Sequence, residues 1–525
     1  MRLMHSKIHQ LFTYQTRLEL DEAQANTLDQ CADFLSQVER TLFANISSGK
    51  KPTDLKSHYL KHYQITARHF NALRIQVEGR ISSIKERQKL HIVEATHKIE
   101  AVQNTISKLE KKNSSNAFHQ KKRLLSNLEL KLKKLKSDQE TGKVRLCFGS
   151  KRLFRAQFDL ASNNYNSHEE WLADWRRERS NSFFLLGSKD EACGNQSCVA
   201  TIAEDGSLTL RIRLPDHLNL GKYLTLPKVH FKYGQQEILA TLKSCEERKN
   251  LHQLKNPQYK ELGLAISYRF KRDHKSWKVF VSVPVPKAAQ VTSNRQGVIG
   301  IDINASHLAV TEIDRFGNPI KKSTVKLNTY GKDQHQTKSL IGNACASIID
   351  YAKATQKTLV IENLDFQKKK TALKEHNNPK HARMLSGLSY SSIKQFLNSR
   401  AWKEGVQVEE VNPAYTSVIG RVKFSKRYGL PVHHAAALSI GRRYLKFSER
   451  IPRHLGSIPD GKGAHVTLSL PVRNRDKHVW AAWGKINREL KTVLAARFRT
   501  SKNRSSRSKT SPETIPKFVR RNSGT

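Results

Sequence analysis

The chain has 525 residues, of which 93 are Lys or Arg and 46 are Asp or Glu, giving a formal net charge of +47. A chain of this length is expected to fold around several cores. So large a positive excess repels itself in a compact fold unless a polyanion neutralises it, so the composition favours a nucleic-acid-binding protein. An anionic membrane is the alternative, but no run of about 18 apolar residues supplies an anchor, and we expect no membrane partner.

The N-terminal sequence and the cysteines indicate a reducing compartment. The first residues, MRLMHSKIHQLFTYQ, contain no continuous apolar stretch of the kind found in secretory signals. Six cysteines in so long a chain do not form a disulfide framework. Cys193 and Cys198 are the one close pair, and their spacing fits loop or buried thiols better than zinc. We therefore expect a cytoplasmic, nucleoid-associated protein of a bacterial or archaeal cell.

The first part of the chain predicts a strand followed by helices. Residues 5–20 alternate polar and apolar side chains, as a strand does. From residue 21 to about 136 the apolar residues follow helical spacing, and the breaker cluster at 113–116 predicts two antiparallel helices joined there. Two compatible interpretations are a coiled-coil hairpin with solvated lysines and a helical lobe that contacts a phosphate backbone.

Between Val144 and Pro286 the pattern predicts short strands, arranged as a barrel or a sandwich. Asp205-Gly206 separates two alternating runs and indicates a hairpin, and residues 228–242 and 277–286 predict further strands. The strand at 5–20 can join this sheet, with the helices inserted between. The predicted organisation is residues 1–20 and 141–290 for the β-domain, 21–140 for the helical lobe, 297–495 for a second domain, and 496–525 for a basic disordered tail.

One carboxylate interrupts an apolar strand at residues 298–303, VIGIDI. Burying an unpaired charge is costly, so Asp302 is expected to pair with a cation or bind a metal. Two more strands, at 307–314 and 319–327, follow through short turns. Three successive strands that open with a buried aspartate are typical of RNase H-like domains.

A second carboxylate, Glu362, ends a similar apolar strand after a helix predicted over residues 333–354. If the first and fourth strands are parallel neighbours, Asp302 and Glu362 meet at one edge of the sheet. Either carboxylate alone could equally well form a salt bridge or bind a metal. The two together, in this order along the chain, favour metal ligation. Mg²⁺ or Mn²⁺ prefers oxygen ligands, and two such ions roughly 3.5–4 Å apart promote in-line phosphodiester hydrolysis.

A third ligand is expected from the helix predicted over residues 432–447, which begins with His433 and His434. Either histidine can ligate a metal or contact the scissile phosphate; a capping or packing role is equally weighted. The basic residues on and before this helix are expected to contact a nucleic-acid backbone. They are Arg421, Lys423, Arg442 and Arg443.

Four segments, GIDINASHLAV, LVIENLDF, VNPAYTS and AAALSIGRR, together resemble the RuvC motifs of the TnpB proteins. These proteins, also called OrfB transposases, are carried by insertion sequences and look like ancestors of the type V CRISPR effector nucleases. The resemblance implies a multidomain α+β and α/β fold: a split β-barrel wedge with an inserted helical recognition lobe, then a RuvC (RNase H-like) nuclease domain. It also implies a guide RNA, a target DNA read by base pairing, and Asp302 and Glu362 as the first two catalytic carboxylates.

The sequence departs from that family at two places. The cysteine pairs of the family's zinc finger are missing after VNPAYTS, so no structural zinc is expected, and His433 stands where the third motif has an aspartate. Asp460 and Asp476 are distant substitutes. The leading hypothesis is an RNA-guided, metal-dependent DNA endonuclease, acting as a monomer or a dimer. The alternatives are a nuclease-inactive guided DNA-binding protein and a strand-joining transposase, which the order Asp, Glu, His disfavours.

Overall fold

A computed structural model describes residues 9–110, 115–364, 390–452, 457–459, 464–468 and 478–507. The chain divides into two compact units, Met1–Lys287 and Ala288–Thr525. Across the described ranges, no helix combines the length and the apolar character needed to cross a bilayer.

The first unit contains two antiparallel sheets, with strand orders β1-β7-β6-β2 and β3-β4-β5. Its strands are β1 (His9–Arg17), β2 (Ser182–Leu185), β3 (Cys198–Ile202), β4 (Leu208–Arg213), β5 (Tyr223–Val229), β6 (Ser267–Arg272) and β7 (Trp277–Pro286). Its α-helices are α1 (Glu22–Ser47), α2 (Pro52–His62), α3 (Ala67–Glu110), α4 (Ser115–Glu140), α5 (Lys151–Ala156), α6 (His168–Arg179) and α7 (Gln235–Gln253).

The N-terminal strand joins the later sheet, as the sequence predicts. β1 pairs with β7 along its whole length, from His9 opposite Pro286 to Arg17 opposite Lys278. Every second residue of β7 is buried, and Val279, Val281 and Val283 share a core with the buried face of α1. The helices between β1 and β2 are thus inserted into a sheet whose strands come from both ends of the unit.

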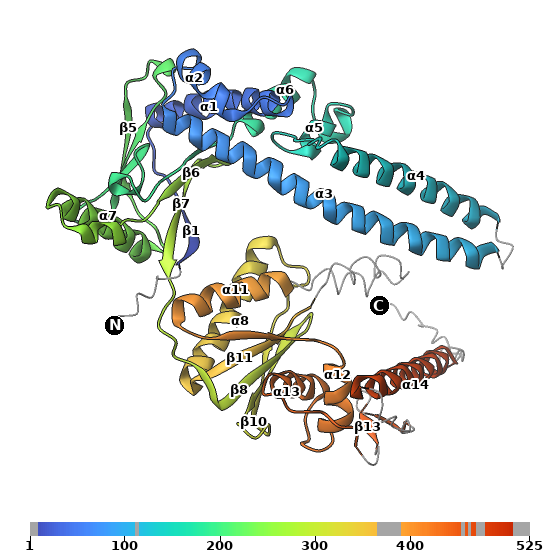
Figure 1. Cartoon of the computed structure of the whole chain (residues 1–525). Helices are drawn as coiled ribbons and strands as arrows, with labels where there is room; N and C mark the ends of the chain where they lie inside the picture. Colours follow the sequence, from blue (N-terminus) through green and yellow to red (C-terminus); the bar gives the residue numbers. More distant parts are fainter. Residues whose placement is uncertain are drawn as a thin grey trace, which may run out of the picture. The chain divides into compact units, whose positions relative to one another are not determined.

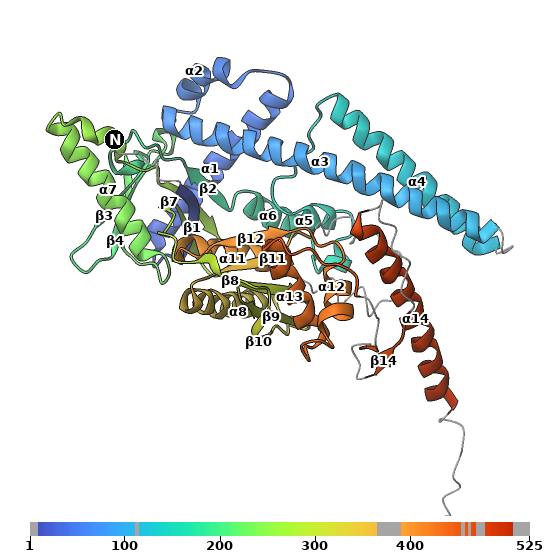
Figure 2. The ribbon, with the colours of Figure 1, turned by 60° about the horizontal axis from the view of Figure 1, so that its bottom comes forward.

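The predicted helical hairpin is confirmed. α3 and α4 run antiparallel and lie side by side along their length, as Figures 1 and 2 both show. Of the predicted breaker cluster, residues 113 and 114 lie outside the described ranges, and residues 115 and 116 begin α4. The hairpin around Asp205-Gly206 is also confirmed, by the pairing of β3 with β4.

The region after residue 144 is less β-rich than the sequence predicts. α5, α6 and α7 lie within it, and the described ladders form two open sheets, not a closed barrel. Residues 235–242, predicted as a strand, belong to α7. Ile238, Leu242 and Cys245 are buried on one face of this helix at four- and three-residue spacing, a helical period that outweighs the local alternation.

The second unit contains a sheet of order β10-β9-β8-β11-β12. The strands of that sheet are β8 (Ser293–Ile303), β9 (His307–Ile313), β10 (Pro319–Lys326), β11 (Lys357–Glu362) and β12 (Val408–Val411). Two short strands of the same unit, β13 (Ile458–Pro459) and β14 (His465–Val466), pair with each other. Its helices are α8 (Gln334–Thr355), α11 (Tyr390–Glu404), α12 (Thr416–Ile419), the π-helical turn η5 (Gly420–Phe424), α13 (Val432–Tyr444) and α14 (Val479–Arg507).

The topology of this sheet agrees with the RNase H-like prediction. β8, β9 and β10 are successive antiparallel strands, and β11 runs parallel to both β8 and β12. The prediction that the strands carrying Asp302 and Glu362 are parallel neighbours is therefore confirmed.

Helices cover both faces of this sheet (Figure 1). Ile299, Ile301 and Leu359 share a core with α8 and α11. Val298 and Val360, on the opposite face, share one with α13. α13 packs unusually close to β8, because a Cβ added at Gly300 would lie 2.0 Å from the carbonyl oxygen of Ala437. Glycine at 300 thus sets the distance between the sheet and the helix that carries His433.

The predicted tail is partly helical. α14 continues to Arg507, past residue 496, where the tail was expected to begin. Alanine, arginine and lysine at the start of this stretch have favourable helix propensities, which explains the continuation. Residues 508–525 of the predicted tail lie outside the described ranges.

Candidate functional site

Asp302 and Glu362 lie on the same face of adjacent parallel strands. Val360 of β11 pairs with Gly300 of β8. Glu362 lies two positions after Val360, and Asp302 lies two positions after Gly300. Because strand side chains alternate between faces, both carboxylates share the face of Gly300, which packs on α13. Both also stand at the carboxyl ends of their strands, where β8 and β11 end.

Asp302 is a largely buried carboxylate with two side-chain hydrogen-bond partners. Its side chain is 11% exposed. The amide Nδ2 of Asn304 donates to Asp302 Oδ2 at 3.0 Å, and His433 Nδ1 lies 2.9 Å from the same oxygen. An ionised carboxylate only accepts hydrogen bonds, so the proton of the His433 contact is on Nδ1.

His433 stands in the first turn of α13 and reaches the surface. Its side chain is 51% exposed, and its ring meets the ring of His307 edge-on, with centroids 5.0 Å apart. With the proton on Nδ1, Nε2 of the neutral imidazole carries a lone pair. His433 therefore joins Asp302 at one end and offers a second nitrogen at the other.

Glu362 is held by groups from the helices after β11. Its Oε1 accepts a hydrogen bond from the Thr416 hydroxyl on α12, and its backbone carbonyl accepts one from the Tyr390 hydroxyl on α11. Arg443 is also close to it. Burial lowers the pKa of Arg443, while the charges of Glu362 and Glu449 act in the opposite direction.

His434, the other candidate on α13, has a structural role. Its Nε2 lies 3.0 Å from the carbonyl oxygen of Ser323 and 3.1 Å from Thr324 Oγ1, and its backbone carbonyl accepts from the Thr311 hydroxyl. The side chain is buried, and burial lowers its pKa. His434 thus ties the start of α13 to β9 and β10, and the expectation that it ligates a metal is revised.

Arg442 and Lys423, which the sequence predicts to contact nucleic acid, form ion pairs within the protein. Both bind the buried carboxylate of Glu449, Arg442 Nε at 2.6 Å. Arg442 also donates to the Gly317 carbonyl oxygen at 2.7 Å and is only 12% exposed. Its guanidinium stacks near the rings of Phe424 and Phe447. These contacts leave neither cation available to a phosphate.

Arg443 and Arg421 are the other two basic candidates. Arg443 donates to the carbonyl oxygen of Asn412 and lies over the ring of Trp480, 5.5 Å from its centroid. Arg443 therefore lies beside Glu362, a position that the sequence does not indicate. Arg421 lies on η5 and is half-buried.

The remaining metal candidates are two cysteines and two aspartates. Cys193 and Cys198 are free thiols in the first unit, and Cys198 is fully buried, which raises its pKa. Asp460 and Asp476 lie outside the described residues. Within those residues, no group of three or more His, Cys, Asp and Glu side chains is close enough to hold a metal ion by itself.

The sequence interpretation missed Asn304 and Thr416 as partners of the two carboxylates. Both stand in motifs already singled out: Asn304 follows Asp302 by two residues, and Thr416 lies in the VNPAYTS segment. A polar residue directly after a buried carboxylate is a signal for the first. The second depends on α12 folding back to β11, which local spacing does not indicate.

No family model matches the chain, and no curated protein matches it. Its structure is similar to that of Cas12f1 in a complex with sgRNA and target DNA, at 12% identity and a TM-score of 0.32, over 83% of this chain and 99% of that one. It is also similar to T. thermophilus RuvC with a Holliday junction substrate, at 15% identity and a TM-score of 0.20, over 27% of this chain and 88% of that one. These scores are low, so the function has to be derived from the residues of the site.

Proposed function

We propose that the second unit is a divalent-metal-dependent nuclease domain of the RuvC type that hydrolyses phosphodiester bonds in DNA. The observation that carries the proposal is the register that sets Asp302 and Glu362 on one face at the carboxyl ends of adjacent parallel strands. Two carboxylates side by side repel one another unless a cation lies between them. A buried Asp302 and a partly buried Glu362 at one edge of the sheet therefore suit a bound cation.

The residues present suit a hard divalent cation such as Mg²⁺ or Mn²⁺. Asp302 and Glu362 supply oxygen ligands, and Asn304, His433 and Thr416 are among the side chains that hydrogen-bond to them. When bound, the metal would activate a water nucleophile and stabilise the leaving oxygen. Such hydrogen bonds orient the carboxylates for a cation.

His433 supports hydrolysis in this proposal. Its Nδ1–H orients Asp302, and its half-exposed side chain leaves Nε2 for a phosphate or a third ligand contact. A histidine buried away from Asp302 would instead have favoured a protein that only binds nucleic acid. The contact with Asp302 therefore favours the nuclease over that alternative.

The partners of this nuclease are proposed from charge and from the resemblance to TnpB proteins. A net charge of +47 suits a protein that binds a guide RNA and a target DNA together. In such a system the guide reads most of the target by base pairing, and an insertion sequence encodes the protein.

The proposal is tested by purifying the chain with its bound RNA and sequencing that RNA. DNA matching the RNA is then incubated with the complex in Mg²⁺, in Mn²⁺ and in EDTA. We expect cutting with either metal and none in EDTA. Asp302→Asn should lower cutting by about 10³-fold or more while affinity is retained. Glu404→Gln, a surface carboxylate of the same unit, is the matched control. Cutting that persists in Asp302→Asn would overturn the proposal.

A further inference from the structure

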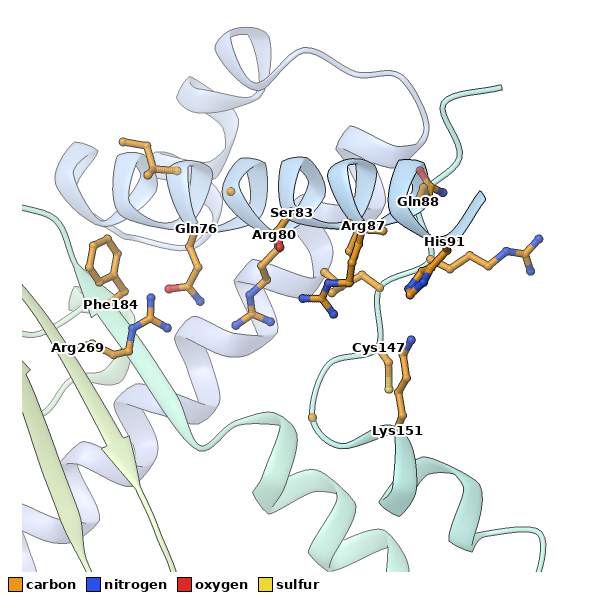
Figure 3. Close-up of a pocket in the computed structure, with 16 residues that line it drawn as sticks. Gln76, Arg80, Ser83, Arg87, Gln88, His91, Cys147, Lys151, Phe184 and Arg269 are labelled. Atoms are coloured by element: carbon orange, nitrogen blue, oxygen red, sulfur yellow. The ribbon is translucent and has the colours of Figure 1, made fainter. Parts of the chain in front are cut away.

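The first unit contains a basic cavity that is remote in sequence from the carboxylates. It has a volume of about 620 Å³ and lies between α3, β6 and the segment 145–151 that leads into α5. Figure 3 shows Arg80 and Arg87 projecting from α3 into this space, with Arg269 and Lys151 approaching it from other elements. None of the described residues that line it is an Asp or a Glu.

A second basic cavity, of about 670 Å³, is lined in part by the same segment. Arg40 of α1, Arg179 at the end of α6 and Arg155 of α5 line it, and again none of its described lining residues is acidic. Arg145 and Lys151 line both cavities. Two arginine-rich cavities thus adjoin across one short segment of chain.

The arginines of each cavity carry more positive charge than their neighbours balance. Glu39 is the buried carboxylate near the first cavity; it binds Arg80 at 3.2 Å and accepts from Gln76 at 2.8 Å. Asp138 neutralises Arg145. Burial and the nearby Arg80 lower the pKa of Arg269, although a guanidinium remains charged.

The second cavity shows the same imbalance. Burial and the nearby Arg179 lower the pKa of Arg40. Nη1 of Arg40 and Nε of Arg179 are buried, and neither has a hydrogen-bond partner among the described residues. Buried donors are normally satisfied, so these two nitrogens indicate a missing acceptor.

Aromatic rings orient the guanidinium groups. Arg80 lies over the ring of Phe148 and Arg269 over the ring of Phe184, at 5.3 and 5.2 Å from the centroids. A guanidinium stacked on a ring keeps its N–H edge free for an in-plane acceptor such as a phosphate oxygen. The stacking thus prepares these arginines for an anion.

We infer that the two cavities bind successive phosphate groups of a single-stranded polynucleotide that passes over the segment 145–151. Two adjoining anion sites suit a polymer with repeated phosphates better than a small anion. Cavities of this size fall in the range that accommodates a nucleotide-sized ligand. The inference rests on the proposed function for its class of ligand and deepens it by assigning a strand-binding site in the first unit.

The test measures strand affinity of the full chain in EDTA, so that cutting does not contribute. Fluorescence anisotropy is recorded with labelled 20-nucleotide RNA and DNA of one sequence over a range of salt. Arg87→Glu combined with Lys151→Glu is compared with Lys108→Glu combined with Lys131→Glu. All four side chains are exposed, and the second pair lies on α3 and α4 outside both cavities.

The cavity variant should bind at least about tenfold more weakly, with a salt slope reduced by ~1.4, about 0.7 for each phosphate that the variant no longer neutralises. The control, which has the same net charge, should change less than threefold. The larger decrease in affinity, with RNA or with DNA, identifies the strand. Equal decreases in both variants, or equal competition by poly-glutamate of matched charge, would overturn the inference.

A second measurement uses the unaltered protein. Acylation of lysine amines is mapped with and without the bound strand, and we expect Lys151 to be protected and Lys108 to remain reactive. Equal reactivity of Lys151 in both states would also overturn the inference. A chain that binds strands through the cavities but never cuts DNA would refute the nuclease proposal alone, and a chain that cuts DNA with unchanged affinity in the cavity variant would refute the cavity assignment alone.

Discussion

His433 Nδ1 lies 2.9 Å from Asp302 Oδ2, although the two residues are 131 positions apart in the chain. The contact joins the end of β8 to the first turn of α13, at the position where TnpB proteins are expected to carry a third carboxylate. In the proposed site, His433 would have two roles that the sequence left open: it would position Asp302, and its half-exposed ring would offer Nε2 to a ligand.

Two substitutions test the role of His433. His433→Leu removes both nitrogens and should lower the cutting rate by about 10²-fold or more, as expected for a group that orients a ligand or transfers a proton. His433→Asp restores a carboxylate and should retain more activity than the leucine variant. Single-turnover cleavage in Mg²⁺ and in Mn²⁺ measures both. Equal rates for the leucine variant and the unaltered chain would exclude His433 from the site.

Arg442 is predicted to stabilise the second unit without binding nucleic acid. Arg442→Ala leaves the buried Glu449 with Lys423 alone and should lower the free energy of unfolding by about 3 kcal/mol. The salt dependence of strand binding should stay unchanged. Urea denaturation and anisotropy titrations measure the two effects, with the exposed Arg427→Ala as control. A reduced salt slope with unchanged stability would restore the prediction made from the sequence.

Arg442 illustrates what the spacing of residues in the sequence can and cannot predict. Apolar runs with a single carboxylate, as at 298–303 and 358–362, predict their strands because such runs are a local signal, whereas the face that the carboxylates share depends on the register between the strands. Glu449 forms ion pairs with Arg442 and Lys423 only after α13 has folded against η5. The same is true of Thr416, whose contact with Glu362 joins residues 54 positions apart. Partners of this kind arise from tertiary packing and leave no periodic signal.

Gly300 is predicted to be essential for placing α13. A Cβ at this position would lie 2.0 Å from the carbonyl oxygen of Ala437, and neither backbone can move without separating the helix from β8. Gly300→Ala should lower the free energy of unfolding by about 3 kcal/mol or more and abolish cutting.

Gly342→Ala is the matched control, since its added methyl group would make only ordinary contact with Phe396 of α11. It should leave stability unchanged or slightly increased. Thermal unfolding and cleavage assays check both variants. An alanine at 300 that folds with unchanged stability would contradict the close packing described for α13.

The first unit is predicted to lose stability in acid through His69. Burial lowers the pKa of this histidine from 6.5 to about 4, and Nε2 donates to the carbonyl oxygen of Arg213 at 3.1 Å. Between these two pKa values, His69 is protonated in the unfolded chain but not in the folded chain. Stability that is complete above pH 6.5 should fall by up to about 3 kcal/mol as the pH decreases to 4.

His69→Gln keeps a donor for Arg213 and removes the titration. Its free energy of unfolding, measured in urea at pH 7.5 and pH 4.5, should fall by less between the two values than that of the unaltered chain. An identical fall in both proteins would show that His69 does not titrate in this range.

Titration of the chain with Mn²⁺, followed by electron paramagnetic resonance of the free ion, tests the central assignment most directly. If Asp302 and Glu362 hold a divalent ion together, Asp302→Asn and Glu362→Gln should each weaken binding by about 100-fold or more, while Glu404→Gln binds like the unaltered chain. Unchanged Mn²⁺ affinity in both carboxylate variants would mean that the two side chains do not share a metal.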